Sequence, residues 1–219
     1  MTRVEPRHQL YGRRKGHALR AHHARLLESL LPQLRVDPPS IARASTAWLE
    51  IGFGGGEHLA RQASLHPEVC FIGAEPFVNG VAKLLALIEV RGLRNVRIHD
   101  GDARVLLETL PDRALDRIYL LYPDPWPKAR HHKRRLVSAA SLAEFQRVLK
   151  PRGLFLFASD WPDYMSWTLF EVGRHGGFFW LAERPCDWRL PFPDWVETRY
   201  EAKAKREGRT PVYLAFERV

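Results

Sequence analysis

The chain has 219 residues, of which 45% are hydrophobic and 11% aromatic, a size and composition that fit one globular domain with an extension and exclude disordered and fibrous classes. Its 34 lysines and arginines exceed its 25 acidic residues, so the net charge is +9 and polyanions are the expected partners. No apolar run approaches the roughly 18 residues of a membrane helix, and the first residues lack the apolar core of a secretory signal. The two cysteines, Cys70 and Cys186, have no metal-site or disulfide-framework spacing. We therefore expect a cytoplasmic protein without membrane contact.

The first 25 residues form a basic stretch that contains seven lysines and arginines but only one acid, Glu5. The basic residues are Arg3, Arg7, Arg13, Arg14, Lys15, Arg20 and Arg25. Leucines at helical spacing follow, from Leu19 to Leu34, until the Pro38-Pro39 pair. We predict that residues 1–40 are a basic arm ending in an amphipathic helix, and that residues 41–219 are the main domain. A disordered tail is the alternative for the arm.

After Ser45, short apolar runs alternate with helical stretches, which is typical of an α/β fold with a mostly parallel sheet and helices on both faces. The predicted strands are Ala47 to Ile51, Cys70 to Ala74, Val96 to His99, Arg117 to Tyr122 and Leu154 to Ser159. The predicted helices are Glu57 to Ser64, Val78 to Arg91, Arg104 to Leu110, Ser138 to Leu149 and Tyr164 to His175.

A glycine-rich turn joins the first strand to the first helix of this pattern and begins directly after Glu50 and Ile51. Glycines such as Gly52 and Gly54 let the backbone turn tightly and let a ligand approach closely. A dinucleotide fingerprint starting at Gly52 would need a third glycine where Glu57 stands, so the pyrophosphate interpretation is weakened. An acid before the turn favours a cationic ligand such as S-adenosylmethionine.

Two further acids follow successive strands of the predicted sheet. Glu75 ends the second strand, where an acid commonly binds ribose hydroxyls. Asp102 follows the third strand, where an acid would bind the edge of the adenine ring, and Asp100 is the other candidate for this contact. Because ligands of such sheets bind at the carboxyl ends of the strands, these acids and the glycine turn together predict a nucleotide-type cofactor site.

The most distinctive segment follows the fourth strand and contains Pro123, Pro125 and Pro127. Three prolines restrict the backbone, so we predict a rigid loop that presents Asp124 at the cofactor edge, with Trp126 available to stack on a nucleobase. The next residues are basic without intervening acids and indicate a phosphate-binding surface: Lys128, Arg130, His131, His132, Lys133, Arg134 and Arg135.

These motifs resemble those of the bacterial tRNA (guanine-N7-)-methyltransferases, from Trp48 to the C-terminus and most specifically from Pro123 to Arg135. The resemblance implies a Rossmann-like class I fold, S-adenosylmethionine as cofactor, and methylation of a guanosine at position 46 in the tRNA variable loop. It implies cofactor binding by Glu50, Gly52, Gly54, Glu75, Asp102 and Asp124.

The resemblance also implies the residues on the substrate side. Asp124 is then the catalytic residue as well, and the stretch from Arg130 to Arg135 contacts RNA. The residues expected to bind substrate are Lys128, Asp160, Thr198, Arg199, Tyr200 and Glu201. Residues 198–201 differ from the family motif at their two middle positions, Arg199 and Tyr200.

Guanine N7 carries a lone pair and no proton, so its methylation needs positioning and charge stabilisation more than a general base. A carboxylate near the base, for which Asp124 is the candidate, would favour the developing positive charge. The pairs His22-His23 and His131-His132 lack acidic or thiol partners, so we expect no metal. One alternative is a methyltransferase that acts on another RNA, on a small molecule or on a protein. Two others are a nucleic-acid-binding module without catalysis and an NAD-linked oxidoreductase. No obligate protein partner is evident from the sequence.

Overall fold

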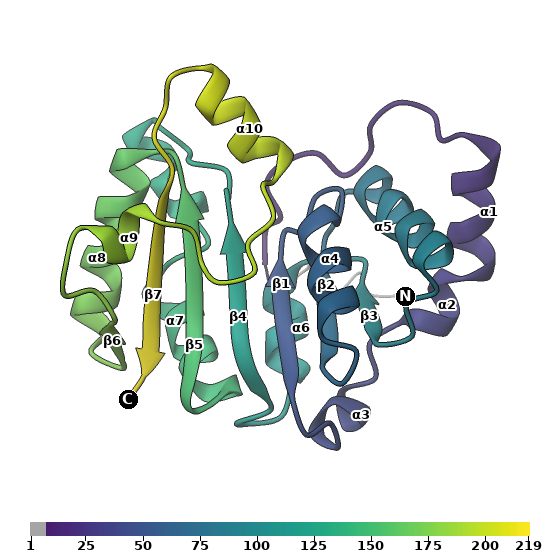
Figure 1. The fold of residues 1–219 in the computed structure, drawn as a ribbon, viewed down its shortest axis with the longest axis horizontal. Helices are drawn as coiled ribbons and strands as arrows, with labels where there is room; N and C mark the ends of the chain where they lie inside the picture. The colour runs from purple at the N-terminus through teal and green to yellow at the C-terminus, as the bar shows by residue number, and fades with distance from the viewer. Residues whose placement is uncertain (1–7) are drawn as a thin grey trace, which may run out of the picture.

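A computed structural model describes residues 8–219 as a seven-stranded sheet with helices on both faces (Figure 1). Arg3 and Arg7 of the predicted basic arm lie outside the described residues. The strand order is β3-β2-β1-β4-β5-β7-β6. The strands are β1 (Ala47–Ile51), β2 (Cys70–Ala74), β3 (Val96–His99), β4 (Leu115–Leu121), β5 (Leu149–Ser159), β6 (Phe178–Trp180) and β7 (Val212–Arg218).

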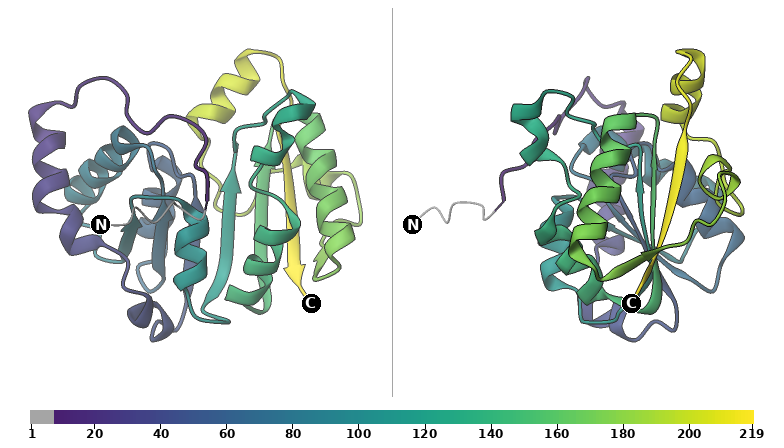
Figure 2. Two further views of the ribbon diagram at one scale, coloured as in Figure 1. Left: turned by 180° about the vertical axis from the view of Figure 1, so that it is seen from behind. Right: turned by 90° about the vertical axis from the view of Figure 1, so that its left-hand side faces the viewer.

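The helices form layers on either side of this sheet. Helices α4 (Glu57–Leu65) and α5 (Val78–Arg91) cover one face, and α6 (Ala103–Thr109), α7 (Ala139–Val148) and α8 (Pro162–His175) cover the other (Figure 2). The remaining helical elements are α1 (Ala21–Ser29), α2 (Leu31–Leu34), α3 (Pro38–Ala42), the 3₁₀ helix η1 (Ala129–Arg134), α9 (Cys186–Arg189) and α10 (Arg199–Arg206). No helix within residues 8–219 is long and apolar enough to cross a bilayer.

Strand residues alternate between two apolar cores, one on each face of the sheet. In β1, Leu49 and Ile51 pack with the residues of α6, α7 and α8, whereas Trp48 packs with those of α4 and α5. Because successive side chains of a strand point to opposite faces, this alternation follows directly from the strand geometry. It also decides on which side each functional residue of a strand lies.

The strand order reverses beside β1, and this reversal places the candidate site. β1 pairs in parallel with β2 on one side and with β4 on the other. The crossover helices after β1 and after β4 therefore leave toward opposite faces, and a crevice opens at the carboxyl ends of these strands. β5 continues the parallel arrangement, while β7 runs antiparallel to β5 and to β6.

The α/β prediction and the five predicted strands and five predicted helices are confirmed, with end shifts of a few residues. The sequence analysis did not predict β6, β7, α9 or α10. β7 completes the sheet between β5 and β6, and its Tyr213, Leu214 and Phe216 are buried. Apolar and polar residues do not alternate clearly along β7, because both faces of this interior strand are covered.

The leucine-rich part of the N-terminal region forms two short helices. Leu26 of α1 and Leu31 and Leu34 of α2 are buried in the core that also contains residues of α5. Figure 2 shows α1 beside α5 at one end of the molecule. The amphipathic leucines thus attach this region to the rest of the fold.

One glycine of α5 allows this helix to approach the glycine turn, and its substitution tests that packing. A Cβ at Gly80 would lie 2.2 Å from the carbonyl oxygen of Gly54, so Gly80→Ala forces backbone to move and is expected to lower the free energy of unfolding by about 1–3 kcal/mol. Gly173 in α8 is the matched control, because a Cβ there meets nothing within 4 Å. Gly173→Ala is expected to raise stability by about 0.5–1 kcal/mol through helix propensity. Urea denaturation measures both values, and equal effects of the two substitutions would contradict the packing account.

Candidate active site

A cavity of about 670 Å³ lies at the carboxyl ends of β1, β2 and β4. The glycine turn forms part of its wall, with Gly52, Gly54 and Gly56 all at positive φ, between 57° and 76°. Gly52 donates a backbone hydrogen bond of 2.8 Å to the carbonyl of Ala74, which fixes the turn to the end of β2. A Cβ at Gly52 would meet no protein atom within 4 Å, so the turn leaves open space for a ligand.

Glu75 is the acid that organises this part of the cavity. It is only 8% exposed, and its two carboxylate oxygens accept hydrogen bonds from the backbone nitrogens of Gly54 at 2.8 Å and Phe77 at 2.9 Å. Burial raises the pKa of the Glu75 carboxyl, and the two backbone donors partly offset this effect. Glu75 therefore joins the glycine turn to the start of α5 while also lining the cavity.

Glu50 lies behind the glycine turn, outside the residues that line the cavity. Its side chain is 5% exposed and its Oε2 is 2.7 Å from Nδ1 of His58, in the first turn of α4. Strand alternation explains this placement, because Glu50, like Trp48, points from β1 toward the face covered by α4. In this arrangement Glu50 supports the turn from behind, and its contact with a cofactor stays a prediction.

Asp102 lines the cavity, whereas its rival Asp100 does not. The Asp102 side chain accepts from the backbone nitrogen of Arg104 at the start of α6 and pairs with the Arg104 guanidinium at 2.6 Å. Burial opposes ionisation of Asp102, but these bonds outweigh it and hold the pKa below its ordinary value. Asp100 instead pairs with Arg35 at 3.0 Å.

The segment of residues 122–128, here called the proline loop, borders the cavity beyond β4. Tyr122 and Trp126 adopt φ values of 50° and 46°, which are unusual for residues other than glycine and often mark functional loops. Asp124 is exposed and lines the cavity together with Trp126. The proline loop therefore presents a free carboxylate at the opening of the cavity, as the sequence predicted.

The predicted cationic residues do not share one environment. Lys128, Arg130 and Lys133 are exposed, and His131 and His132 are partly exposed. Arg134 lies 4.8 Å from the ring centre of Trp126 and 4.8 Å from that of Tyr11. Arg135 is buried, so the structure differs from the expectation that the whole stretch from Arg130 to Arg135 faces RNA.

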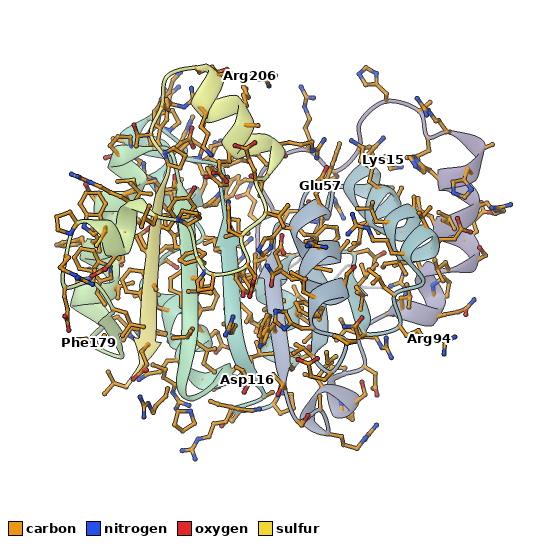
Figure 3. The ribbon with its side chains drawn as sticks, in the orientation of Figure 1. Lys15, Glu57, Arg94, Asp116, Phe179 and Arg206 are labelled. Carbon is orange, nitrogen blue, oxygen red and sulfur yellow. The ribbon has the colours of Figure 1, made fainter. Side chains whose placement is uncertain are left out.

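The N-terminal segment of residues 8–20 forms a further wall of the cavity, which sequence reasoning missed. Leu10, Tyr11, Gly12 and Arg13 line it. The segment is held by a bond of 3.0 Å from the backbone nitrogen of Val78 to Arg14 and by bonds between Asn79 and the backbone of residues 16 and 17. Figure 3 places Lys15 at the same end of the molecule as Glu57 and Arg206, away from Asp116.

The predicted C-terminal residues divide between the cavity and the interior. Tyr200 lines the cavity and lies against the glycine turn, while Arg199 pairs with Glu57 at 2.8 Å. Thr198 caps α10 by accepting from the backbone nitrogen of Glu201 at 3.1 Å. The structure thus brings Tyr200 to the cavity and gives Thr198 a role in helix formation.

Two predicted substrate-binding acids are paired internally. Glu201 is 1% exposed and accepts hydrogen bonds from Nε1 of Trp195 at 2.6 Å and from the hydroxyl of Tyr213 at 2.7 Å. Asp160 accepts a hydrogen bond from Nε of Arg209. Neither acid is among the residues that line the cavity, so in this arrangement both hold the C-terminal region in place.

Protein families and individual proteins similar to this chain share one activity in their names. A family described as putative methyltransferase matches residues 44–214. The tRNA (guanine-N(7)-)-methyltransferase of Agrobacterium fabrum is 53% identical over 216 residues, covering 94% of this chain and 93% of the relative. The enzyme of the same name from Roseobacter denitrificans is 50% identical, with 98% of each chain covered.

Solved structures share the fold at low sequence identity. The 16S rRNA methyltransferase KamB matches with a TM-score of 0.58 at 18% identity, covering 82% of this chain and 91% of that one. The 16S rRNA (adenine(1408)-N(1))-methyltransferase from Catenulisporales acidiphilia matches with a TM-score of 0.53 at 18% identity, covering 84% and 94%. At this identity the likeness concerns the fold alone.

The reversed strand order and the glycine turn at the cavity are those of a class I fold, and the matching family makes the chain an S-adenosylmethionine-dependent methyltransferase. The full-length relatives give the more specific assignment. The chain belongs to the family of the bacterial tRNA (guanine-N7-)-methyltransferases. Its cavity fits the cofactor of that family, because open space beside Gly52 adjoins the acids Glu75 and Asp102.

No group of three or more histidine, cysteine, aspartate or glutamate side chains in the described part of the chain could hold a metal ion.

The partly buried His99 behind Asp102 predicts a pH dependence of stability. Its Nε2 lies 3.1 Å from the Asp102 carbonyl, and burial lowers the pKa of the imidazole from 6.5. As the pH falls below 6.5, the unfolded chain binds a proton that the folded protein does not, so stability decreases, by at most about 1.4 kcal/mol per pH unit. His99→Asn is expected to flatten the curve of stability against pH in this range. Parallel curves for His99→Asn and the unaltered protein would contradict the assignment.

Proposed function

We propose that this protein transfers the methyl group of S-adenosylmethionine to N7 of a guanosine in the variable loop of tRNA, forming 7-methylguanosine. The observation that carries the proposal is the position of Asp124, exposed on the proline loop between the cofactor cavity and the cationic side chains of η1. Family membership supports the reaction and the substrate. The protein would act in the cytoplasm on tRNA, without an obligate protein partner.

S-adenosylmethionine would occupy the cavity and supply a methyl group activated on a sulfonium. The backbone at Gly52 and Gly54, the Glu75 carboxylate and Asp102 would hold the cofactor, with Asp124 at the side where the methyl group leaves. The carboxylates of Glu75 and Asp124 in the lining would favour the positive charge of the sulfonium. Glu50, through His58, would keep the glycine turn in place from behind.

Methyl transfer to N7 requires the base and the methyl group to be aligned, because N7 attacks with a lone pair that carries no proton. Asp124 would accept hydrogen bonds from the N1 and N2 edge of guanine and stabilise the positive charge that the base gains. This attraction is stronger in the transition state than in the ground state, so it lowers the barrier. We assign Asp124 as the catalytic residue on this ground.

The tRNA would lie over the exposed cations beside the cavity. Lys128 would bind a substrate phosphate, and Arg130, His131 and His132 of η1 would contact RNA. Lys133, Arg134 and Arg13 of the N-terminal segment line the cavity itself. Trp126 and Tyr200 provide rings near the opening for contact with a base. Because N7 lies in the narrow major groove of A-form RNA, the target guanosine must be locally unpaired or opened.

The remaining predicted substrate residues would act around this opening. Arg199 and Tyr200 lie nearest to the glycine turn, whereas Thr198, Glu201 and Asp160 would shape the region through their internal bonds. We retain the division into a basic arm with its helix, residues 1–40, and a methyltransferase domain, residues 41–219. In this proposal the arm contributes both to the cavity wall and to the RNA-binding surface.

Replacing Asp124 tests the catalytic assignment. Asp124→Asn keeps the size of the side chain but removes its charge, so methyl transfer at saturating substrates is expected to fall by about 100-fold or more. Affinity for tRNA, measured by filter binding, is expected to change by less than about threefold because phosphate contacts dominate binding. Equal losses of rate and affinity would mean that Asp124 binds RNA rather than stabilising the reaction.

Replacing exposed cations tests the RNA-binding surface. Lys133→Ala and Arg130→Ala are each expected to weaken tRNA binding and to reduce the salt slope of binding by about one. Arg94→Ala is the matched control, because this exposed arginine lies far from Lys15 and the cavity end of the molecule (Figure 3). Unchanged salt slopes for Lys133→Ala and Arg130→Ala would place the tRNA elsewhere on the protein.

A further inference from the structure

Arg135 differs from the other cations that follow the proline loop. All three of Lys133, Arg134 and Arg135 line the cavity, but the side chain of Arg135 has 0% exposed area, whereas Lys133 is exposed and Arg134 partly exposed. A residue with a buried guanidinium has no surface to offer to a phosphate of tRNA. Its contacts must therefore be sought inside the protein.

The Arg135 guanidinium joins the proline loop to helix α8. Its Nε donates to the carbonyl oxygen of Pro125 at 3.0 Å, and its Nη2 donates to the carboxylate of Asp163 in the first turn of α8. The guanidinium carbon also lies 4.9 Å from the ring centre of Tyr164 and 5.2 Å from that of Trp167. One side chain thus bonds the loop on one side and contacts three residues of α8 on the other.

The proline loop depends on this bond because it makes few of its own. Prolines at positions 123, 125 and 127 lack a backbone N–H and cannot donate. Tyr122 is bonded to Ala158 before these residues, and Lys128 accepts from His131 after them. Within residues 8–219, the bond from Arg135 to Pro125 is the only hydrogen bond made by the backbone of residues 123–127.

The bonded carbonyl directly follows Asp124 in the chain. Asp124 itself is exposed, and its carboxylate has no hydrogen-bonding partner in the described part of the chain. The position of its backbone, and hence of the carboxylate, is therefore set by the prolines, by contacts of the Trp126 ring and by the one backbone hydrogen bond of the loop, from Arg135 to Pro125. The arrangement is not one that maximises stability, because Nη1 of the buried guanidinium has no partner among the described residues.

We propose that Arg135 is a positioning residue for methyl transfer, which holds the proline loop against α8 so that Asp124 stays at the opening of the cavity. The inference rests on the proposed role of Asp124 in the reaction. It removes Arg135 from the RNA-binding set and gives its positive charge a place inside the protein, paired with Asp163. Displacement of a reacting group by about 1 Å is enough to cost about 100-fold in rate, so the loss of one such bond has a measurable effect.

Arg135→Met tests the proposal, because methionine retains apolar volume beside Tyr164 and Trp167 while both hydrogen bonds are lost. The rate at saturating tRNA and cofactor is expected to fall by about 10- to 100-fold, with tRNA affinity within about twofold and an unchanged salt slope. A loss of affinity with a salt slope reduced by about one would overturn the proposal and return Arg135 to the RNA contacts.

Arg147→Met is the matched control. Arg147 also donates to backbone carbonyls, those of Leu107 and Leu110, and pairs with Glu144, but it lies on α7 outside the cavity lining. Its replacement is expected to lower stability while leaving the rate and the tRNA affinity unchanged. A comparable fall in rate for Arg147→Met would show that the loss of any arginine bonded to backbone carbonyls has this effect, and would contradict the proposal.

A measurement without substrate separates this inference from the proposed function. Trypsin cleaves after lysine and arginine, so the exposed Lys128 and Arg130 report on the order of the adjoining loop. Cleavage at these two residues, identified by mass spectrometry, is expected to be several-fold faster in Arg135→Met than in the unaltered protein and in Arg147→Met. Unchanged cleavage would overturn the inference even if tRNA methylation is confirmed, and faster cleavage would support it even if the substrate proves to be different.

The ion pair provides an independent check through a double-mutant cycle. Asp163→Asn removes the carboxylate that fixes the guanidinium, so it is expected to accelerate cleavage and slow the reaction less than Arg135→Met does. The double variant is expected to be no slower than Arg135→Met alone, because both substitutions act through one contact. Additive losses would mean that the two residues act separately and would contradict the proposal.

Discussion

The reversal of strand order beside β1 is the constraint on which the rest of this protein depends. It makes the ends of β1, β2 and β4 converge without closing the space between them, so the residues after each strand face a common cavity. Glu75 then fixes part of the cavity wall, because its carboxylate accepts hydrogen bonds from both the glycine turn and the start of α5. Loops of quite different composition can reach the same cavity only because the sheet brings their first residues together.

Side chains of both charges line this cavity. The wall carries the carboxylates of Glu75, Asp102 and Asp124, which suit a cationic methyl donor and a base that becomes positively charged. The surface beyond the proline loop carries cations, which suit a polyanion. Lys133 and Arg134 line the same cavity as Glu75 and Asp102, so the cations that suit RNA adjoin the carboxylates that suit the cofactor.

Much of this arrangement follows from local sequence. The glycine turn, the acids at the strand ends and the proline loop were predictable because each is determined by neighbouring residues and by the geometry of a parallel sheet. Three features were not. Glu50 pairs with His58 because of the strand face on which it lies, and Arg135 turns inward because Asp163 of α8 is beside it; both depend on packing between distant segments. The N-terminal segment reaches the cavity through backbone bonds to Val78 and Asn79, which leave no hydrophobic periodicity in the sequence.

The measurement that tests the central claim most directly is methyl transfer from labelled S-adenosylmethionine to unmodified tRNA, followed by nucleoside analysis and mapping of the modified position. The account predicts label in 7-methylguanosine within the variable loop, and none in a tRNA whose only change is another base in place of that guanosine. Label in a different nucleoside would retain the fold and the cofactor but contradict the target. Cofactor binding without transfer to any tRNA would contradict the assignment of the cationic surface and of Asp124 to tRNA methylation.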